Sequence, residues 1–148
     1  MSDLYQEVIL EEYRHPQHRG LLAQPDVSHG ERNASCGDQL TVTLKISPAK
    51  SSEAEAVISE IGWEGEGCAI SMASMSVLSA QIIDQKLSTV LNYQQKDLEE
   101  WLGLEDLTIS RQKCLLLGLE AVKAAIQKWQ EIHMPQTLSK KQNVSEVK

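Results

Sequence analysis

Three cysteines and one aspartate are the side chains of this sequence best suited to chemistry. Cys36 and Asp38 lie two residues apart, and Cys68 and Cys114 follow much later in the chain. Three thiolates and one carboxylate form a chemically reasonable tetrahedral ligand set for zinc, or for iron with sulfide. Spacing alone does not decide whether the four residues share one site, because ligands so far apart form no compact motif.

Cys68 stands between a glycine-rich turn and a long apolar segment. Gly65 and Gly67 allow a sharp turn and the close approach of another group. Apolar and small side chains over residues 69–83 predict a buried helix, which places Cys68 in its first turn. The helix N-terminus would favour a thiolate there, whereas the alternative is a cysteine that serves as a small core side chain.

Cys36 and Asp38 fall in the connection between two predicted strands within residues 27–47. Apolar and polar residues alternate over the second of these strands, as in a half-buried sheet. If the connection is extended, Cys36 and Asp38 lie on the same side, with Gly37 allowing distortion between them. The pair is then half of a metal site, although aspartate and glycine are equally common in a simple turn.

Cys114 belongs to the last long predicted helix, over residues 110–132. Ser110 can serve as the N-cap of this helix, and Arg111 lies on the same side as Cys114, three residues away. The four ligands together carry a charge of about −4, and zinc supplies +2. A nearby cation such as Arg111 would offset the remaining negative charge. An apolar stripe defines the buried side of the helix: Leu115, Leu119, Val122, Ile126 and Trp129.

The other segments supply the remaining elements. We expect a helix over residues 4–13, a polar hairpin loop over residues 48–55 and a third strand over residues 56–63. Short helical pieces occupy residues 85–107, the clearest being residues 97–102. His15 and His18 are interpreted as loop-surface histidines rather than as a metal-binding pair. The inward face of the third strand is predicted to carry Val57, Ile61 and Trp63.

Composition limits the class of protein. A chain of 148 residues with 41% hydrophobic residues is long enough for one domain, predicted over residues 1–133, followed by a disordered tail over residues 134–148. A net charge of −7 without a basic stripe argues against nucleic acid as a partner, and no apolar run approaches membrane length. Three cysteines without a Cys-x-x-Cys pair, and a start without signal-peptide features, predict a reducing, cytoplasmic location.

Four segments together resemble the U-type iron–sulfur cluster assembly proteins, the family of IscU, SufU and the NifU N-terminal domain. The resemblance covers roughly residues 4–129, and the combination of segments is more specific than any one of them. These segments are Leu4–Leu10 continuing into His15-Pro16-Gln17-His18-Arg19-Gly20, then Asn33-Ala34-Ser35-Cys36-Gly37-Asp38, Gly65-Glu66-Gly67-Cys68-Ala69-Ile70-Ser71, and Arg111-Gln112-Lys113-Cys114.

The resemblance implies an α+β fold, with a small antiparallel three-stranded sheet packed by helices and a cysteine–aspartate cluster exposed at one end. It also implies that Cys36, Asp38, Cys68 and Cys114 bind zinc or a [2Fe–2S] cluster. The implied function is iron–sulfur cluster assembly: the family accepts persulfide sulfur from a cysteine desulfurase, and many members build a cluster for apo-proteins. The alternatives are a zinc-dependent sulfur acceptor that builds no cluster, or a purely structural zinc module.

The chain combines features of two branches of this family. Lys113 replaces the histidine that precedes the last cysteine in IscU proteins, whereas Arg111 and the Gly-Glu-Gly-Cys segment resemble SufU. The step of 46 residues from Cys68 to Cys114 is too short for the insertion usual in SufU. The chain therefore resembles SufU at its motif residues and IscU in its length.

The resemblance and the local sequence together favour Cys36 as the first sulfur acceptor. Cys36 lies beside flexible Gly37, whereas Cys114 lies on a packed helix and Cys68 opens the most buried one. Cys68 should therefore be the least free of the three thiols. Arg111 is predicted to support the charge of the site and to contact the desulfurase. A cysteine hydrolase is disfavoured, because no histidine lies near a cysteine in sequence.

Overall fold

The computed structural model describes residues 3–34, 37–48 and 55–133. The predicted polar loop over residues 48–55 and the predicted tail lie almost entirely outside these ranges. The elements follow in the order α1 (Asp3–Arg14), β1 (Val27–Asn33), β2 (Asp38–Ser47), β3 (Val57–Glu66), α2 (Ala69–Ile82), α3 (Leu87–Leu91), α4 (Gln95–Leu102) and α5 (Ile109–His133).

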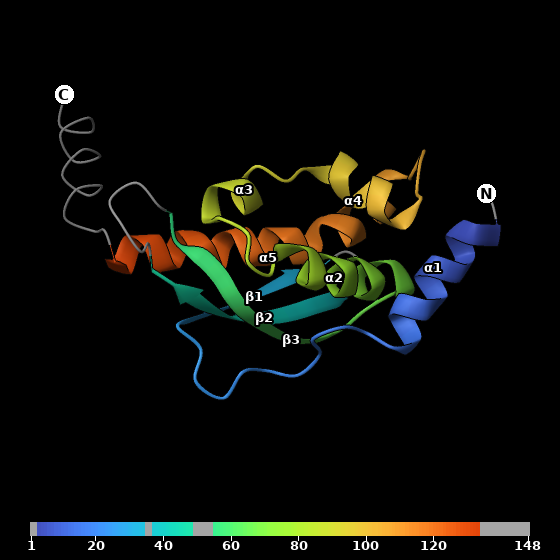
Figure 1. Cartoon of the computed structure of the whole chain (residues 1–148). Helices are drawn as coiled ribbons and strands as arrows, with labels where there is room; N and C mark the ends of the chain where they lie inside the picture. The colour runs from blue at the N-terminus through green and yellow to red at the C-terminus, as the bar shows by residue number, and fades with distance from the viewer. Residues whose placement is uncertain (1–2, 35–36, 49–54, 134–148) are drawn as a thin grey trace, which may run out of the picture.

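The three strands form one antiparallel sheet in the order β1-β2-β3. The connection between β1 and β2 is a tight hairpin, closed by the pairing of Asn33 with Asp38 and by a 2.9 Å hydrogen bond from the Gly37 N–H to the Asn33 carbonyl. Gly37 has a φ of 76°, so the backbone is not extended at this residue, which directly precedes Asp38. Cys36 itself lies outside the described residues. The confirmed fold class is a three-stranded antiparallel sheet packed by helices (Figure 1).

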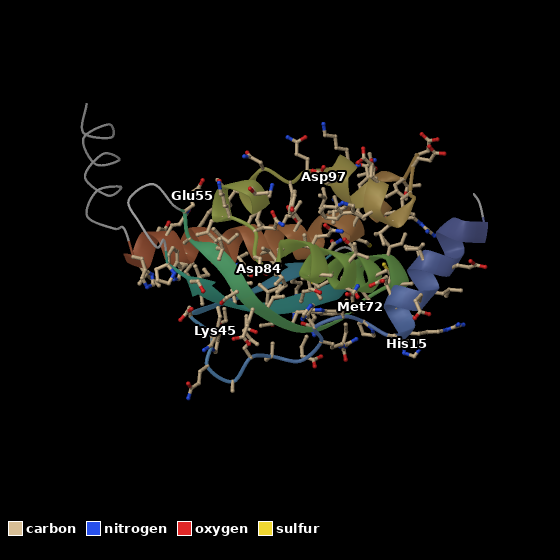
Figure 2. All side chains as sticks on the ribbon, viewed as in Figure 1. His15, Lys45, Glu55, Met72, Asp84 and Asp97 are labelled. Atoms are coloured by element: carbon tan, nitrogen blue, oxygen red, sulfur yellow. The ribbon has the colours of Figure 1, made fainter. Side chains whose placement is uncertain are left out.

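Helices cover one face of the sheet. α5 runs across β1 and β2, and α2 packs against α1, α5 and β3 (Figure 1). Side chains fill the layer between sheet and helices (Figure 2). The inward face of β2 supplies its apolar residues in strict alternation, all buried: Leu40, Val42, Leu44 and Ile46. This alternation is the pattern that predicted the strand, because successive side chains point to opposite faces.

The buried residues of β3 differ from the prediction. Ile58, rather than Val57, is fully buried, together with Ile61 and Trp63. The register shows why: Lys45 pairs with Glu60 while the next residue of β2 pairs with Ile58, so one extra residue of β3 is unpaired at this point. Such a bulge shifts the alternation by one residue, so that Ile58 and Ile61 share the inward face.

The segment between α1 and β1 lies against β3 and the open face of the sheet. The Gly20 N–H donates to the Trp63 carbonyl at 2.7 Å, and the Trp63 indole N–H donates to the Gln17 carbonyl at 2.8 Å. Leu22 donates its N–H to the Thr43 hydroxyl at 3.0 Å, on the face opposite the helices. His15 and His18 are exposed in this segment, as predicted. The loop therefore covers part of the sheet and leaves open the end near Asp38.

Candidate metal and sulfur site

Asp38 is the first residue of β2 and the most buried of the predicted ligands that the structure describes. Its side chain is only 2% exposed, although it lies at the end of the sheet. The Oδ1 atom accepts the backbone N–H of Cys68 at 3.1 Å, and Oδ2 lies 3.9 Å from the Cys68 sulfur. A carboxylate that binds the backbone of one ligand residue and lies beside its sulfur is held ready to share a metal with it.

Cys68 is the N-cap of α2, with extended backbone dihedrals, rather than a residue of the first helical turn. This position explains its exposure, because the cap lies outside the buried helix that follows it. The prediction that Cys68 is the least free thiol is wrong in terms of exposure, since Cys68 is exposed and Cys114 is buried. Within α2 the prediction of a buried helix is confirmed, because nearly every residue from Ile70 to Ile82 is buried.

Gly67 makes the approach of Asp38 to Cys68 sterically feasible. A Cβ atom at Gly67 would lie 2.5 Å from the Ser71 hydroxyl and 2.7 Å from Asp38 Oδ1, closer than such contacts occur. This is the close approach for which the sequence analysis assigned the glycine. Ser71 is fully buried; its hydroxyl donates to the Cys68 carbonyl at 3.0 Å and lies 3.7 Å from the Cys68 sulfur. Sequence reasoning assigned no role to Ser71, because a lone serine in a helix gives no signal.

Cys114 comes from the second turn of α5 and is 4% exposed. Its position is set by the packing of α5 on α2. The Ser74 hydroxyl donates to the Leu115 carbonyl at 2.7 Å, and Gly118 lies against Met75 with no room for a Cβ atom. The close crossing of these two helices brings the Cys114 sulfur to the end of α2, where Cys68 lies.

The structure brings three of the four predicted ligands together. Ligand atoms of Asp38, Cys68 and Cys114 all lie within 4.8 Å of one another. Two ligands of one tetrahedral zinc ion lie roughly 4 Å apart, because zinc–sulfur bonds are about 2.3 Å long. The three donors are therefore spaced for a shared metal ion. Cys36, the fourth predicted ligand, lies outside the described residues.

Arg111 lies in the first turn of α5, one turn before Cys114, and is exposed. Neither of the two ion pairs among the described residues includes Arg111: one joins Arg19 to Glu64 and the other joins His29 to Glu31. The interaction of Arg111 with the site therefore stays a prediction. α5 begins at Ile109, so the predicted N-cap Ser110 is wrong. Thr108 takes this place, and its hydroxyl accepts the Arg111 N–H at 3.3 Å.

Comparison with known families decides the relationship that the motifs indicated. The NifU-like N terminal domain matches residues 4–136, which is most of the chain. The chain belongs to this family. The resemblance stated from the sequence is thereby confirmed, and the three donor residues of the NifU-like domain lie at the motif positions on which it rested.

Curated relatives of this NifU-like domain include members of both branches named above. The chain is 26% identical to the zinc-dependent sulfurtransferase SufU of Bacillus subtilis (strain 168), over 86% of this chain and 92% of the relative. It is 27% identical to the iron–sulfur cluster assembly scaffold protein IscU of Thermotoga maritima, over 84% of this chain and 94% of the relative. The two identities are too similar to assign a branch.

A solved structure has the same fold. The N-terminal part of a nitrogen-fixing NifU-like protein from Brucella abortus superposes with a TM-score of 0.67 at 23% identity, covering 87% of this chain and 96% of that one. At this identity the match establishes the fold alone. Across the residues that the structure describes, none of the helices has the length and apolar character needed to cross a membrane.

Proposed function

We propose that this chain is an iron–sulfur cluster assembly protein that accepts persulfide sulfur from a cysteine desulfurase. One observation carries the proposal: a buried carboxylate and two thiols from three separate elements meet within 4.8 Å at one end of the sheet. The relatives support it, because one is named a zinc-dependent sulfurtransferase and another a cluster assembly scaffold. Cys36, two residues from Asp38, supplies the third thiol.

The donor set fits a metal of borderline softness. In the proposed site, Cys36, Asp38, Cys68 and Cys114 hold one zinc ion, or the same thiols hold the iron of a nascent cluster that is cargo for transfer. A bound zinc ion would keep the thiols deprotonated. Oxygen and sulfur donors of Asp38 and Cys68 already lie 3.9 Å apart, near the separation that tetrahedral ligands require.

Sulfur acceptance is a thiol–persulfide exchange that needs no external oxidant. An acceptor thiolate of this chain attacks the outer sulfur of the persulfide on the desulfurase. The sulfur–sulfur bond of that persulfide breaks, and the desulfurase cysteine leaves as a thiolate. The acceptor then carries a new persulfide at the same overall oxidation level. Cys36 is the proposed first acceptor, and Arg111 is proposed to offset the negative charge of the site.

Anaerobic reconstitution tests the proposal. The purified chain is incubated with a cysteine desulfurase and cysteine, with and without ferrous iron. Bound zinc, iron and sulfide are then measured, and each cysteine peptide is examined for added sulfur by mass spectrometry. We expect added sulfur on a site cysteine, first on Cys36, and its loss in the variant Cys36→Ser. Added sulfur first on Cys114, and retained in Cys36→Ser, would contradict the assignment of the acceptor.

The same experiment separates the three functional alternatives. Iron and sulfide bound together, with absorption typical of a cluster, would indicate a scaffold. Zinc that is retained while added sulfur appears would indicate a zinc-dependent acceptor. Tightly held zinc with no added sulfur on any cysteine would indicate a structural zinc module and overturn the proposed function. Arg111→Ala is expected to slow sulfur acceptance while leaving stability within about 0.5 kcal/mol of the wild type.

A further inference from the structure

Ser71 places a buried hydroxyl in the first turn of α2, beside the sulfur of Cys68. The side chain of Ser71 is fully buried, and its oxygen lies 3.7 Å from the Cys68 sulfur, within hydrogen-bond reach of that large atom. The hydroxyl also donates to the Cys68 carbonyl at 3.0 Å. A serine hydroxyl has one hydrogen to donate and rotates about one bond, so it can serve either acceptor, one at a time.

The Cys68 carbonyl does not require the Ser71 hydroxyl. The Met72 N–H donates to the same carbonyl at 3.1 Å, which is the regular hydrogen bond of the first helical turn. The bond from Ser71 is therefore additional. The carbonyl stays paired within α2 when the hydroxyl turns toward the sulfur.

Gly67 provides the space in which this hydroxyl and the ligand residues meet. A Cβ atom at Gly67 would lie 2.5 Å from the Ser71 oxygen and 2.7 Å from Asp38 Oδ1. Gly67 does not have a positive φ, so the close approach of these groups, rather than a turn that favours glycine, accounts for the residue. The Ser71 hydroxyl thus occupies the same tight corner as the carboxylate of the candidate site.

Two polar groups of the described residues lie against the Cys68 sulfur: Asp38 Oδ2 at 3.9 Å and the Ser71 hydroxyl at 3.7 Å. As a thiol, Cys68 can donate its hydrogen to either group. A metal binds the thiolate instead, and a thiolate only accepts hydrogen bonds. The carboxylate of Asp38 has no hydrogen to donate, so Ser71 is the one of the two that can bond the sulfur of the metal-bound form.

We propose that Ser71 is a positioning residue of the metal site, whose hydroxyl donates to the Cys68 thiolate when a metal is bound. The inference rests on the proposed function, because it requires that the site binds a metal. The hydroxyl turns from the Cys68 carbonyl to the sulfur without movement of the backbone. A hydrogen bond to a charged acceptor is roughly twice as strong as one to a neutral acceptor, so the sulfur is the preferred partner. The bond fixes the direction of a sulfur that belongs to an exposed residue.

Two measurable effects follow from such a bond. Groups that hydrogen-bond to metal ligands orient them, and their loss usually lowers metal affinity about 10- to 100-fold. A hydrogen bond to a ligand sulfur also lowers the energy of the sulfur electrons, which is how such bonds change the potentials of copper and iron–sulfur centres. A serine that only fills space in α2 would not change these electrons, so the second effect identifies the bond itself.

Cobalt(II) tests both effects, because it binds sites of the zinc type and its charge-transfer absorption comes from the ligand sulfurs. The matched control for Ser71→Ala is Ser79→Ala. Ser79 is equally buried in α2, and its hydroxyl donates to the Ser76 carbonyl, three residues earlier, at 2.6 Å. We expect Ser71→Ala to weaken cobalt binding about tenfold or more, and to move the sulfur-to-cobalt absorption to longer wavelength at saturating cobalt. Ser79→Ala should leave both at wild-type values.

The position of the absorption band decides whether Ser71 acts on the sulfur. An unshifted band in Ser71→Ala, even with weaker binding, would show a structural role only and overturn the proposal, as would equal shifts in both variants. Ser71→Thr keeps the hydroxyl and should retain the wild-type band. If Ser71→Ala binds no cobalt, failure of Ser71→Thr to bind it would overturn the proposal as well. Wild-type protein that binds no cobalt would contradict the proposed metal site itself, and the role of Ser71 with it.

Discussion

The starts of α2 and α5 both carry a cysteine, but they position it in opposite ways. Cys68 is exposed at the cap of α2, and its backbone is held by a hydrogen bond to Asp38. Cys114 is buried in the second turn of α5, and its place is set by the crossing of α5 with α2. Cys68 is therefore positioned by a polar contact and is open to a partner, whereas Cys114 is positioned by packing and is shielded from solvent.

This difference suits a site that must bind a metal and also exchange sulfur. A ligand that is held by packing cannot leave without opening two helices, whereas a ligand at an exposed cap can be reached from outside. We therefore expect Cys114 to retain the metal most firmly, while exchange occurs on the side of Cys68 and the hairpin that contains Cys36.

Removing the charge of Asp38 is expected to have the largest effect. Asp38→Asn keeps an oxygen that can accept the Cys68 N–H, so the fold around α2 should persist. The anionic ligand is lost, so zinc affinity should fall by at least the roughly 10- to 100-fold that the loss of a supporting outer contact costs. Competition with a zinc chelator measures this change. The exposed Asp106→Asn, with the same charge change, should bind zinc like the wild type.

A larger side chain at the crossing of α5 with α2 should displace Cys114, the cysteine positioned by packing. A side chain at Gly118 would press on Met75, whose sulfur lies 2.8 Å from where a Cβ atom would be. Gly118→Val is expected to destabilise the fold by about 1–3 kcal/mol, the usual cost of overpacking, and to displace Cys114. Urea unfolding of the metal-free protein measures the first effect. Valine has a higher helix propensity than glycine, so a loss of stability in Gly118→Val would come from packing. Gln127→Val, at an exposed position of the same helix, should cost only a few tenths of a kcal/mol.

Thiol labelling measures the difference in accessibility between Cys68 and Cys114 directly. In metal-free, reduced wild-type protein, iodoacetamide should modify Cys68 about tenfold faster than Cys114 or more, because the buried thiol must await local opening. A time course analysed by peptide mass spectrometry gives the two rates separately. In urea above the unfolding transition, the two rates should become similar. Equal rates in the native protein would show that Cys114 is not protected by the helix crossing.

The sequence was sufficient to predict the helices and strands but not the contacts between them. Alternation over β2 and the apolar run of α2 predicted both elements, because each pattern reflects the face that is buried. The bulge in β3 and the pairing of Arg19 with Trp63 depend on contacts across the sheet, for which local sequence gives no signal. The exposure of Cys68 was misjudged because the sequence analysis placed Cys68 within the buried helix, whereas it is the cap residue outside that helix.

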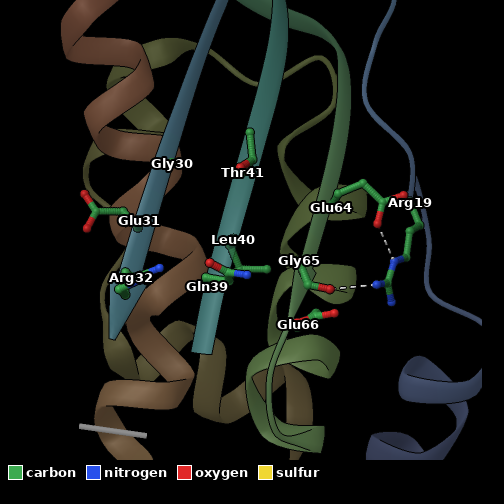
Figure 3. Close-up of a pocket in the computed structure, with 10 residues that line it drawn as sticks. All are labelled: Arg19, Gly30, Glu31, Arg32, Gln39, Leu40, Thr41, Glu64, Gly65 and Glu66. Atoms are coloured by element: carbon green, nitrogen blue, oxygen red, sulfur yellow. Dashed lines mark hydrogen bonds and ion pairs between the residues drawn. The ribbon is translucent and has the colours of Figure 1, made fainter. Parts of the chain in front are cut away.

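The family motifs, rather than spacing, brought the site together in the prediction. Asp38, Cys68 and Cys114 are 30 and 46 residues apart along the chain, and no local rule predicts that they converge. Gly67 was correctly assigned to a close approach, although the groups that approach it, Asp38 and Ser71, could be named only from the structure. The hollow over this end of the sheet (Figure 3) was not predicted, because residues from three strands and the loop before β1 form it.

The caps of the two helices provide the smallest expected effect. α2 has no side-chain hydrogen bond at its cap, whereas Thr108 accepts the Arg111 N–H at the start of α5. Because this bond is exposed and 3.3 Å long, Thr108→Ala should cost about 0.5 kcal/mol, the low end of the range for lost N-caps. The urea midpoints of the metal-free wild type and variant measure this loss of stability. Ser110→Ala, which alters the residue that sequence alone favoured as the cap, should cost less. If Ser110→Ala is the more destabilising variant, α5 begins two residues later in solution, at Arg111, and Cys114 lies in its first turn.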